Sequence, residues 1–200
     1  SLVGGMLLSG IAKMSHRIQK ALVGMLLMGS MACGVCFGAT LEQLSEQRLI
    51  EESTEIVRGT VLFCQQTYRQ PVIWTICDVR VTERFMGGEG NRVLVAIPGG
   101  TAGGFRQNFE GTPNLERNGE YLFFLWQGKS GLKQIMGLSQ GLLNVVRDER
   151  GSLVLVRGKI EEQMVDAAGR AVEDGGLKMP LEQMRREIAG RTGKSRGVKQ

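Results

Sequence analysis

The chain has 200 residues, of which 22% are charged, and a formal net charge of +5 at pH 7. Of its 25 Lys and Arg residues, three precede residue 21 and four lie in the last ten, so residues 40–190 carry 18 basic and 20 acidic side chains. This near-neutral centre argues against a nucleic-acid surface. The only histidine, His16, lies in the N-terminal leader described next, which excludes Ser-His-Asp, Cys-His and HExxH sites from the rest of the chain.

The N-terminal segment has the layout of a secretory signal. An uncharged apolar run at 21–37 follows Arg17 and Lys20 and ends in small residues. Met14 is its natural start, so we interpret residues 1–39 as a signal peptide with an upstream leader, cleaved near Thr40. The alternative is an uncleaved anchor, but 17 residues fall short of the ~20 that span hydrocarbon. The predicted location is secreted or periplasmic.

The next segment predicts a short helix. Residues 40–43 (TLEQ) fit a capping box, in which Thr40 and Gln43 would satisfy backbone groups at the helix start. Leu41, Leu44 and Leu49 would share one face of this helix. We expect it to pack on the domain as a lid.

Seven short β-rich runs follow within about 100 residues, many of them alternating apolar and polar residues, and turn residues separate them. The connections at 127–131 and 148–151 have hairpin length and contain Gly where a positive φ is needed. These features predict a mainly β fold, a small OB-like antiparallel barrel over residues 40–158. The predicted strands are 56–66, 72–84, 92–97, 120–126, 133–136, 142–147 and 153–157.

Cys64 and Cys77 are the two cysteines that remain after the leader. If the first two strands pair as a hairpin about Gln70 and Pro71, opposed positions sum to 141, and the two cysteines face each other. We therefore predict a disulfide, which an exported protein can keep oxidised. A redox pair and a metal site are the alternatives, but the spacing is not CxxC and no histidine remains as a further ligand.

A glycine-rich stretch at 97–105 (IPGGTAGGF) follows the third predicted strand. A phosphate-binding loop would end in Lys-Ser or Lys-Thr and open a helix, and this stretch does neither. We predict a flexible or tightly folded surface loop that contacts a partner. The residues expected to make the contact are Gly99, Gly100, Gly103, Gly104, Phe105, Arg106 and Phe109.

Residues 159–200 differ in character and are interpreted as a C-terminal extension. Residues 164–172 suit a weak hairpin, and 180–189 a short helix with Pro180 at its first position and Gly190 at its end. Leu181, Met184 and Ile188 line one side of that helix. We expect the basic tail from 191 to be disordered.

No set of residues predicts catalysis. The carboxylates at 51–52, 161–162 and Asp78 carry no pattern that would hold two of them across a cleft, and Asp78 is expected to be solvated. Trp74, Trp126, Tyr68 and Tyr121 fall in predicted strands, where aromatic residues most often pack across strands. A ligand-stacking face is the alternative for them.

Two segments resemble signatures of the netrin-like module, the OB-type barrel of tissue inhibitors of metalloproteinases and of netrin and complement C-terminal domains. They are 53–61 (STEIVRGTV) and 118–125 (NGEYLFFL). The layout also resembles exported bacterial proteins of unassigned function that have a short helix, this barrel, an IPGG-type loop and a C-terminal helix. The resemblance implies binding to an exported protease. Those inhibitors chelate the catalytic zinc through a mature N-terminal Cys, which is missing near Thr40, so this mechanism does not carry over.

The sequence therefore predicts an exported, non-enzymatic protein-binding module, such as an accessory or inhibitor of an extracytoplasmic protease. We expect no cofactor, no metal site and no nucleic-acid partner. The alternative is an envelope-associated structural or tethering protein, held by an uncleaved leader or by the basic tail. An enzyme working through Lys or paired carboxylates is a third, less favoured hypothesis.

Overall fold

The computed structural model describes residues 40–197, with side chains to residue 191. The predicted signal peptide and His16 lie outside the described residues. The described residues belong to one compact unit.

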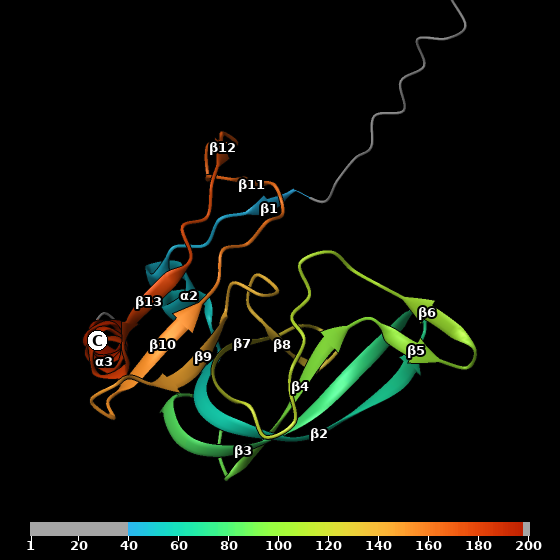
Figure 1. The fold of residues 1–200 in the computed structure, drawn as a ribbon, viewed down its shortest axis with the longest axis horizontal. Helices are drawn as coiled ribbons and strands as arrows, with labels where there is room; N and C mark the ends of the chain where they lie inside the picture. Colours follow the sequence, from blue (N-terminus) through green and yellow to red (C-terminus); the bar gives the residue numbers. More distant parts are fainter. Residues whose placement is uncertain (1–39, 198–200) are drawn as a thin grey trace, which may run out of the picture. The chain divides into compact units, whose positions relative to one another are not determined.

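The fold is mainly β, with one helix near each end of the described chain (Figure 1). All seven predicted strands are confirmed, as β2, β3, β4 and β7–β10, and several are longer than expected. The helices are α2 (Glu46–Glu52) and α3 (Leu181–Gly197). The strands are β1 (Leu41–Glu42), β2 (Glu55–Arg69), β3 (Val72–Met86), β4 (Arg92–Pro98), β5 (Gly100–Ala102), β6 (Phe105–Gln107), β7 (Glu120–Gln127), β8 (Lys133–Ile135), β9 (Leu142–Arg147), β10 (Leu153–Arg157), β11 (Met164–Val165), β12 (Ala171–Val172) and β13 (Leu177–Pro180).

The main sheet has eight strands in the order β13-β10-β9-β7-β2-β3-β4-β8, and β8 also pairs with β7. The pairings β2–β3–β4–β8–β7–β2 thus return to their start, and we call these five strands the strand ring. Its pairs are antiparallel except β4–β8, which is parallel and rests on Ala96 opposite Gln134. The expected mainly β, largely antiparallel architecture is confirmed, but this single pair joins the ring too weakly to describe it as a closed barrel.

Strands β2 and β3 form the long hairpin that the sequence predicts. Arg69 lies opposite Val72, and Cys64 lies opposite Cys77. The two cysteines form a disulfide, with Cα atoms 4.0 Å apart. Register shifts interrupt the pairing nearer the start of β2, and such bulges bend a long strand and increase its twist. One end of the hairpin can therefore belong to the ring while its other end forms the protruding tip beside the Gln70–Pro71 turn.

Two apolar clusters fill the structure because β2 and β7 are buried on both faces. Val57, Phe123 and Leu125 lie in the first cluster, with residues of β3, β4 and β8. Their neighbours Ile56 and Phe124 lie in the second, with residues of β10 and both helices. Successive side chains of a strand point to opposite faces, so an uninterrupted apolar run such as that of β7 supplies both clusters.

The N-terminal helix exists, but the predicted capping box is wrong. Leu41 and Glu42 form a strand parallel to Met164 and Val165. The helix begins at Glu46, and its N-cap is Ser45, whose Oγ accepts a hydrogen bond from the Arg48 backbone at 3.2 Å. Both Thr40 and Ser45 are suitable cap residues, and pairing with a strand more than 100 residues away decides between them.

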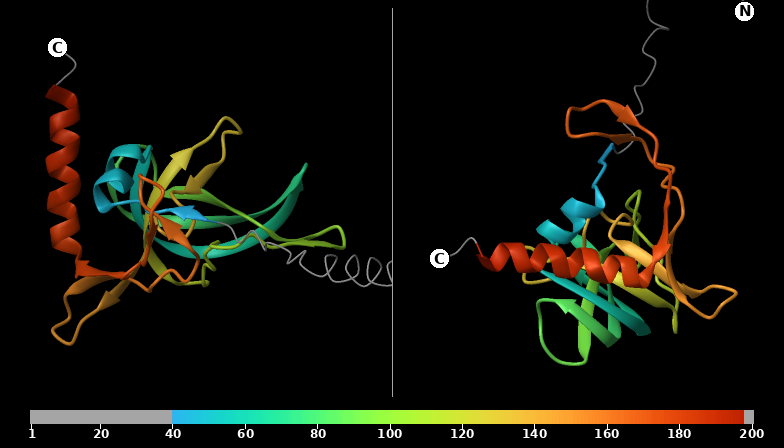
Figure 2. Two further views of the ribbon diagram at one scale, coloured as in Figure 1. Left: turned by 90° about the horizontal axis from the view of Figure 1, so that it is seen from above. Right: turned by 90° about the vertical axis from the view of Figure 1, so that its left-hand side faces the viewer.

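The C-terminal region joins the same sheet and core. β13 pairs with β10, and Leu181, Met184 and Ile188 of α3 are buried in the second cluster, as the predicted helix face requires. The predicted weak hairpin is present as β11 and β12, which complete with β1 a small separate sheet that we call the arm. Helix α3 continues past Gly190 to Gly197, so its predicted end and the expected disorder directly after it are wrong. Figure 2 shows α2 and α3 away from the tips of β2 and β3.

Candidate partner-binding site

The glycine-rich stretch folds into a small hairpin. Strands β5 and β6 pair in antiparallel fashion, with Ala102 opposite Phe105. The two residues between them, Gly103 and Gly104, have φ values of 58° and 81°. A two-residue hairpin turn with positive φ at both positions strongly favours Gly. The sequence signal was correct for a tight surface turn, and the structure shows that it belongs to a hairpin.

Side-chain amides attach this hairpin to the tip of β2 and β3. Gln107 Oε1 accepts a hydrogen bond from the Ile73 backbone at 2.7 Å, and its Nε2 donates to the Pro71 carbonyl at 3.1 Å. Gln66 Oε1 accepts from the Thr101 backbone at 3.1 Å. These two glutamines were missed by the sequence analysis because an isolated Gln in a strand carries no signal for a contact across 35 positions.

A depression of about 480 Å³ lies where this hairpin meets the disulfide. We call it the hairpin groove. Its walls include Cys64, Gln66, Gly99, Gly100 and Arg106. A Cβ on Gly100 would lie 2.9 Å from Thr75 Oγ1, so glycine allows the backbone to approach β3 closely here. Arg106 is the only charged residue that lines the groove, and its guanidinium forms no ion pair with the described residues.

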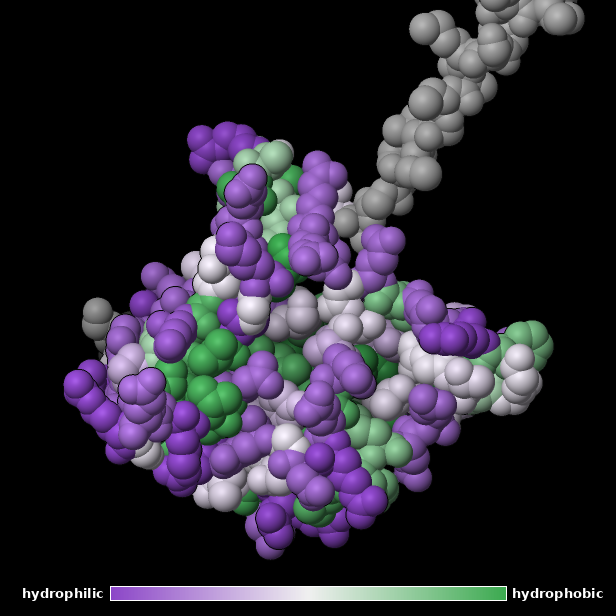
Figure 3. Space-filling view, in the orientation of Figure 1, coloured by the Kyte–Doolittle hydropathy of each residue, from purple (hydrophilic) through white to green (hydrophobic). Residues whose placement is uncertain are grey.

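Aromatic side chains flank the hairpin groove. Phe105 is 74% exposed and Phe109 is 40% exposed. Tyr68, on the β2 tip, is 57% exposed. The apolar colouring at the end of the β5–β6 hairpin is visible in Figure 3. Exposed aromatic groups beside a polar depression are typical of sites that bind another molecule.

The predicted contact residues divide into two sets. Gly99, Gly100 and Arg106 line the hairpin groove. Gly103, Gly104 and Phe105 form the exposed end of the β5–β6 hairpin, and Phe109 lies next to Gly99, since a Cβ on that glycine would be 3.5 Å from its ring. The structure therefore places all seven predicted residues on or beside one surface feature.

A second depression, of about 380 Å³, lies beyond the segment 112–114 and extends to the chain that leads into the arm. We call it the arm groove. Its walls include Asn144, Arg157, Lys159, Glu161 and Glu162. Thr112, Pro113 and Asn114 line both grooves. This shared wall, the ridge, was not anticipated from the sequence.

The ridge is held firmly at both ends. Thr112 Oγ1 donates to the Phe109 carbonyl at 2.7 Å, and the Gly111 carbonyl accepts from the Ser139 backbone at 3.1 Å. After the ridge, Leu115 is buried in the first cluster, and the Glu116 backbone donates to the Tyr121 hydroxyl at 3.1 Å. Both grooves are thus bounded by chain that is already ordered, which lowers the entropic cost of binding.

The buried carboxylates are paired with cations. Asp78 is 7% exposed and accepts two hydrogen bonds from Arg92, so the expectation that it is solvated is wrong. Glu55 is ion-paired with Arg84 and Lys133. Buried carboxylates held by cations in this way suit a structural role.

Asp174 is a third buried carboxylate that is paired with a cation. It accepts hydrogen bonds from Arg157 at 2.7 Å and 3.0 Å and from the Ile160 backbone at 2.9 Å. Burial raises the pKa of Asp174, but these hydrogen bonds outweigh burial, and the pKa lies below its ordinary value. The ion pair also neutralises Arg157 at the wall of the arm groove.

The four aromatic residues from the predicted strands have different environments. Tyr121 is buried and makes an edge-on contact with Phe123, two residues further along the same strand, at 5.7 Å between ring centroids. This ring contact lies within β7 and is not the expected packing across strands. Tyr68 and Trp126 are exposed, and Trp74 is half-buried. Tyr68 lies opposite Ile73 near the tip of β2 and β3, and Trp74 is the next residue of β3, opposite Thr67.

Within residues 40–191, no three His, Cys, Asp or Glu side chains gather as they would around a metal ion. Neither helix in the described part is both long and apolar enough to cross a membrane. The chain matches no known family of proteins and none of the curated proteins. The resemblance to the netrin-like module stays a prediction, and the structure adds that its two segments pair directly, with Glu55 opposite Leu125 and Thr60 opposite Glu120.

Proposed function

We propose that this chain is an exported, non-catalytic module that binds another extracytoplasmic protein through the hairpin groove and the aromatic residues beside it. The observation that carries the proposal is that the exposed residues Phe105 and Phe109 lie on the segment that lines an ordered, polar depression together with Arg106. Aromatic residues and Arg are enriched among the residues that contribute most to protein–protein binding. Anchored by Gln66 and Gln107, the hairpin would present them with little loss of entropy.

The burial of the acidic side chains against cations favours a binding function over an enzymatic one. General acid–base catalysis needs a carboxyl or other group that can reach a substrate. Glu55, Asp78 and Asp174 are buried against cations instead. The described lining of the hairpin groove contains no carboxylate.

An exported protease is the partner class that we propose, on the resemblance to protease inhibitors. Zinc chelation by an N-terminal Cys is not part of the proposal, because a chain that begins near Thr40 has no Cys before Cys64, and Cys64 is bonded to Cys77. A protein of this kind would contact a protease through a projecting loop, and the β5–β6 hairpin provides one. The activity would be regulation or assistance of the protease by binding alone.

The test is capture of partners from the extracytoplasmic fraction by the immobilised protein, followed by their identification. Phe105→Ser should reduce the retained partner by tenfold or more, since loss of a central aromatic anchor costs about 2 kcal/mol or more. Leu94→Ser is the matched control, because Leu94 is 59% exposed and does not line the groove. Equal retention by both variants would count against this surface, and turnover of a hydrolase substrate that one carboxylate variant abolishes would count against the function.

Tethering to the envelope is the second candidate, favoured by the cluster of four basic residues in the last ten positions. Such a cluster is attracted to anionic lipid or polymer by about 1 kcal/mol per charge. Fractionation separates the two functions. Protein that high salt releases without its first 39 residues supports a free binding module, whereas protein that only detergent releases supports a tether.

A further inference from the structure

We propose that the hairpin groove and the arm groove together bind one extended peptide segment, which crosses the ridge at Asn114 and is oriented by charge. This inference rests on the proposed function and specifies the kind of partner segment that it requires. It is carried by the shared wall of the two grooves, the free amide on that wall and the opposite charges at the two ends.

The shared wall makes the two depressions neighbours. Thr112, Pro113 and Asn114 line both of them, so a chain that leaves one groove over the ridge enters the other. Their volumes, about 480 Å³ and about 380 Å³, each suit a few side chains. An extended segment fits two such depressions separated by a narrow ridge better than a compact ligand does.

Asn114 is placed to hold the main chain of such a segment. It is exposed, and its side-chain amide makes no hydrogen bond with the rest of the described chain. A primary amide has both donor and acceptor capacity, so it can pair with a peptide N–H and C=O of the same residue. This contact does not depend on the sequence of the peptide, and the anchored ridge holds the backbone that carries the amide.

The charges at the two ends differ in sign. Among the described residues, Arg106 is the only charged one that lines the hairpin groove. In the arm groove Arg157 is neutralised by Asp174, which leaves Lys159 against Glu161 and Glu162. The complementary segment therefore has an acidic residue at the hairpin end and a basic residue at the arm end. Like charges placed against each other would disfavour the opposite orientation.

Three fluorescein-labelled peptides of twelve residues serve as probes in a polarisation titration with the full protein up to 1 mM. All have a Ser, Thr, Gly and Ala background; one is neutral, one has three Glu in one half, and one has three Lys in one half. Arg106→Gln should weaken the Glu peptide about two- to fivefold and leave the Lys peptide unchanged, because exposed ion pairs are worth little more. Glu162→Gln should weaken the Lys peptide by a similar factor and leave the Glu peptide unchanged.

Asn114→Leu should weaken all three peptides by about tenfold, as the loss of both main-chain hydrogen bonds requires. Asn91→Leu is the matched control, since Asn91 is also exposed and lines neither groove, and it should leave binding unchanged. Circular dichroism and thermal melting of each variant verify that it is folded.

Several outcomes would overturn the inference. One is that no peptide binds. Another is that Arg106→Gln and Glu162→Gln change the binding of the two charged peptides equally. A third is that N-acetylglucosamine oligomers bind saturably and the peptides do not. The proposed function fails separately: if Phe105→Ser leaves partner capture intact while the peptides behave as expected, the combined groove stands and the hairpin contact falls. If Phe105→Ser abolishes capture while Asn114→Leu has no effect on any peptide, the hairpin contact stands and the combined groove falls.

Discussion

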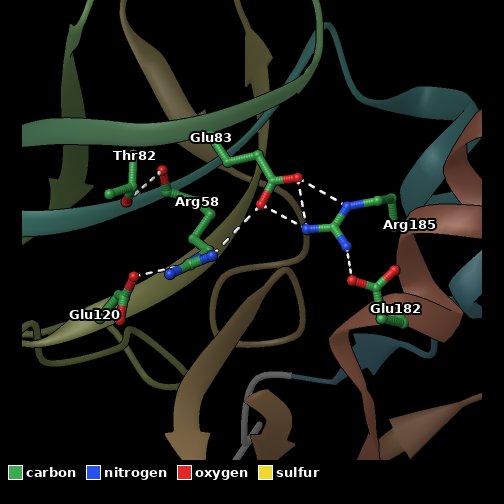
Figure 4. A network of polar contacts seen from close by, with 6 residues as sticks. All are labelled: Arg58, Thr82, Glu83, Glu120, Glu182 and Arg185. Atoms are coloured by element: carbon green, nitrogen blue, oxygen red, sulfur yellow. Dashed lines mark hydrogen bonds and ion pairs between the residues drawn. The ribbon is translucent and has the colours of Figure 1, made fainter. Parts of the chain in front are cut away.

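Arg185 on helix α3 and Glu83 on β3 form a two-pronged ion pair across 102 positions of the chain, with Nε–Oε1 and Nη2–Oε2 distances of 2.8 Å each (Figure 4). Glu83 also contacts Arg58 of β2, which in turn bonds Glu120 of β7 at 2.7 Å. The Arg185 guanidinium lies 5.8 Å from the centre of the Phe85 ring. Polar contacts thus link the last helix to three strands of the ring, beside its apolar face.

Arg185→Met should lower the free energy of unfolding by about 1 kcal/mol, because the ion pair is bidentate but partly exposed. Methionine keeps much of the apolar contact with Phe85 and removes the charge. Urea unfolding measures the difference. Arg186→Met is the control, since Arg186 is exposed and forms no ion pair with other described residues, and it should change stability by less than about 0.5 kcal/mol. Equal effects of the two variants would contradict the role given to the network.

Gly59 of β2 makes a close approach that no other residue could make. A Cβ there would lie 2.7 Å from both the Arg80 carbonyl oxygen and Val79 Cγ1. Gly59→Ala should therefore destabilise the protein by about 1–3 kcal/mol through overpacking. Gly175→Ala is the control, because a Cβ on Gly175 meets nothing within 4 Å. Melting temperatures that fall equally for both variants would contradict the steric role given to Gly59, because the loss of unfolded-chain entropy on replacing Gly by Ala favours folding.

The strand pattern was readable from sequence because it depends on neighbours in the chain. The alternation from Cys77 to Val81 reflects one buried face, with Cys77 and Val79 fully buried in the first cluster. The register that places Cys64 opposite Cys77 follows from the position of Pro71 in the turn. Local periodicity and turn chemistry determine such features.

The features that the sequence did not predict depend on contacts between residues that are far apart in the chain. Asp78 is buried because Arg92, on the next strand, pairs with it, and the short strand at Leu41–Glu42 exists because Met164 lies beside it. The two grooves are formed by the loop after β6, the disulfide and the segment after β10, which are far apart in sequence. The glycine-rich stretch could be recognised from sequence as a tight surface turn, and its role as a contact site stays a prediction. The ridge and the arm groove could be found only from the fold.

The disulfide joins strands that already pair, so its contribution to stability comes through the unfolded chain. With a separation of 13 residues, the chain-entropy relation gives about 3 kcal/mol. The Cys64→Ala/Cys77→Ala variant should be destabilised by this amount in urea. Adding a reductant should lower the stability of the unaltered protein towards that of the variant and leave the variant unchanged. An unaltered protein insensitive to reductant, with full access of both thiols to an alkylating reagent, would mean that the bond is absent.

The ion pair of Asp174 and Arg157 should make the free energy of unfolding decrease at low pH. The hydrogen bonds from Arg157 and Ile160 outweigh burial and lower the pKa of Asp174 in the folded protein. Its contribution is therefore complete above the ordinary pKa of Asp, about 4, and is lost as the pH falls through the lower folded value. Asp174→Asn should cost about 3 kcal/mol at pH 7, because it leaves Arg157 with little compensation. The difference should shrink below about pH 4, and a constant difference from pH 7 to pH 2 would contradict this assignment.

Glu46 at the start of α2 should show the opposite dependence on pH. Burial raises the pKa of Glu46, the negative charge of Glu187 on α3 raises it further, and Arg157 only partly offsets them. The folded protein therefore holds this proton more tightly than the unfolded chain, so ionisation costs stability above the ordinary pKa of Glu, about 4.3. Glu46→Gln should stabilise the protein at pH 7, and the gain should vanish at about pH 4 and below. Glu51→Gln is the comparison, because Glu51 pairs with Arg191 at 3.2 Å and its loss brings no such gain. Thermal melting of both variants at pH 7 and pH 4 measures the difference. A Glu46→Gln variant that is less stable than the unaltered protein at pH 7 would contradict the assignment that burial and Glu187 together disfavour the charge of Glu46.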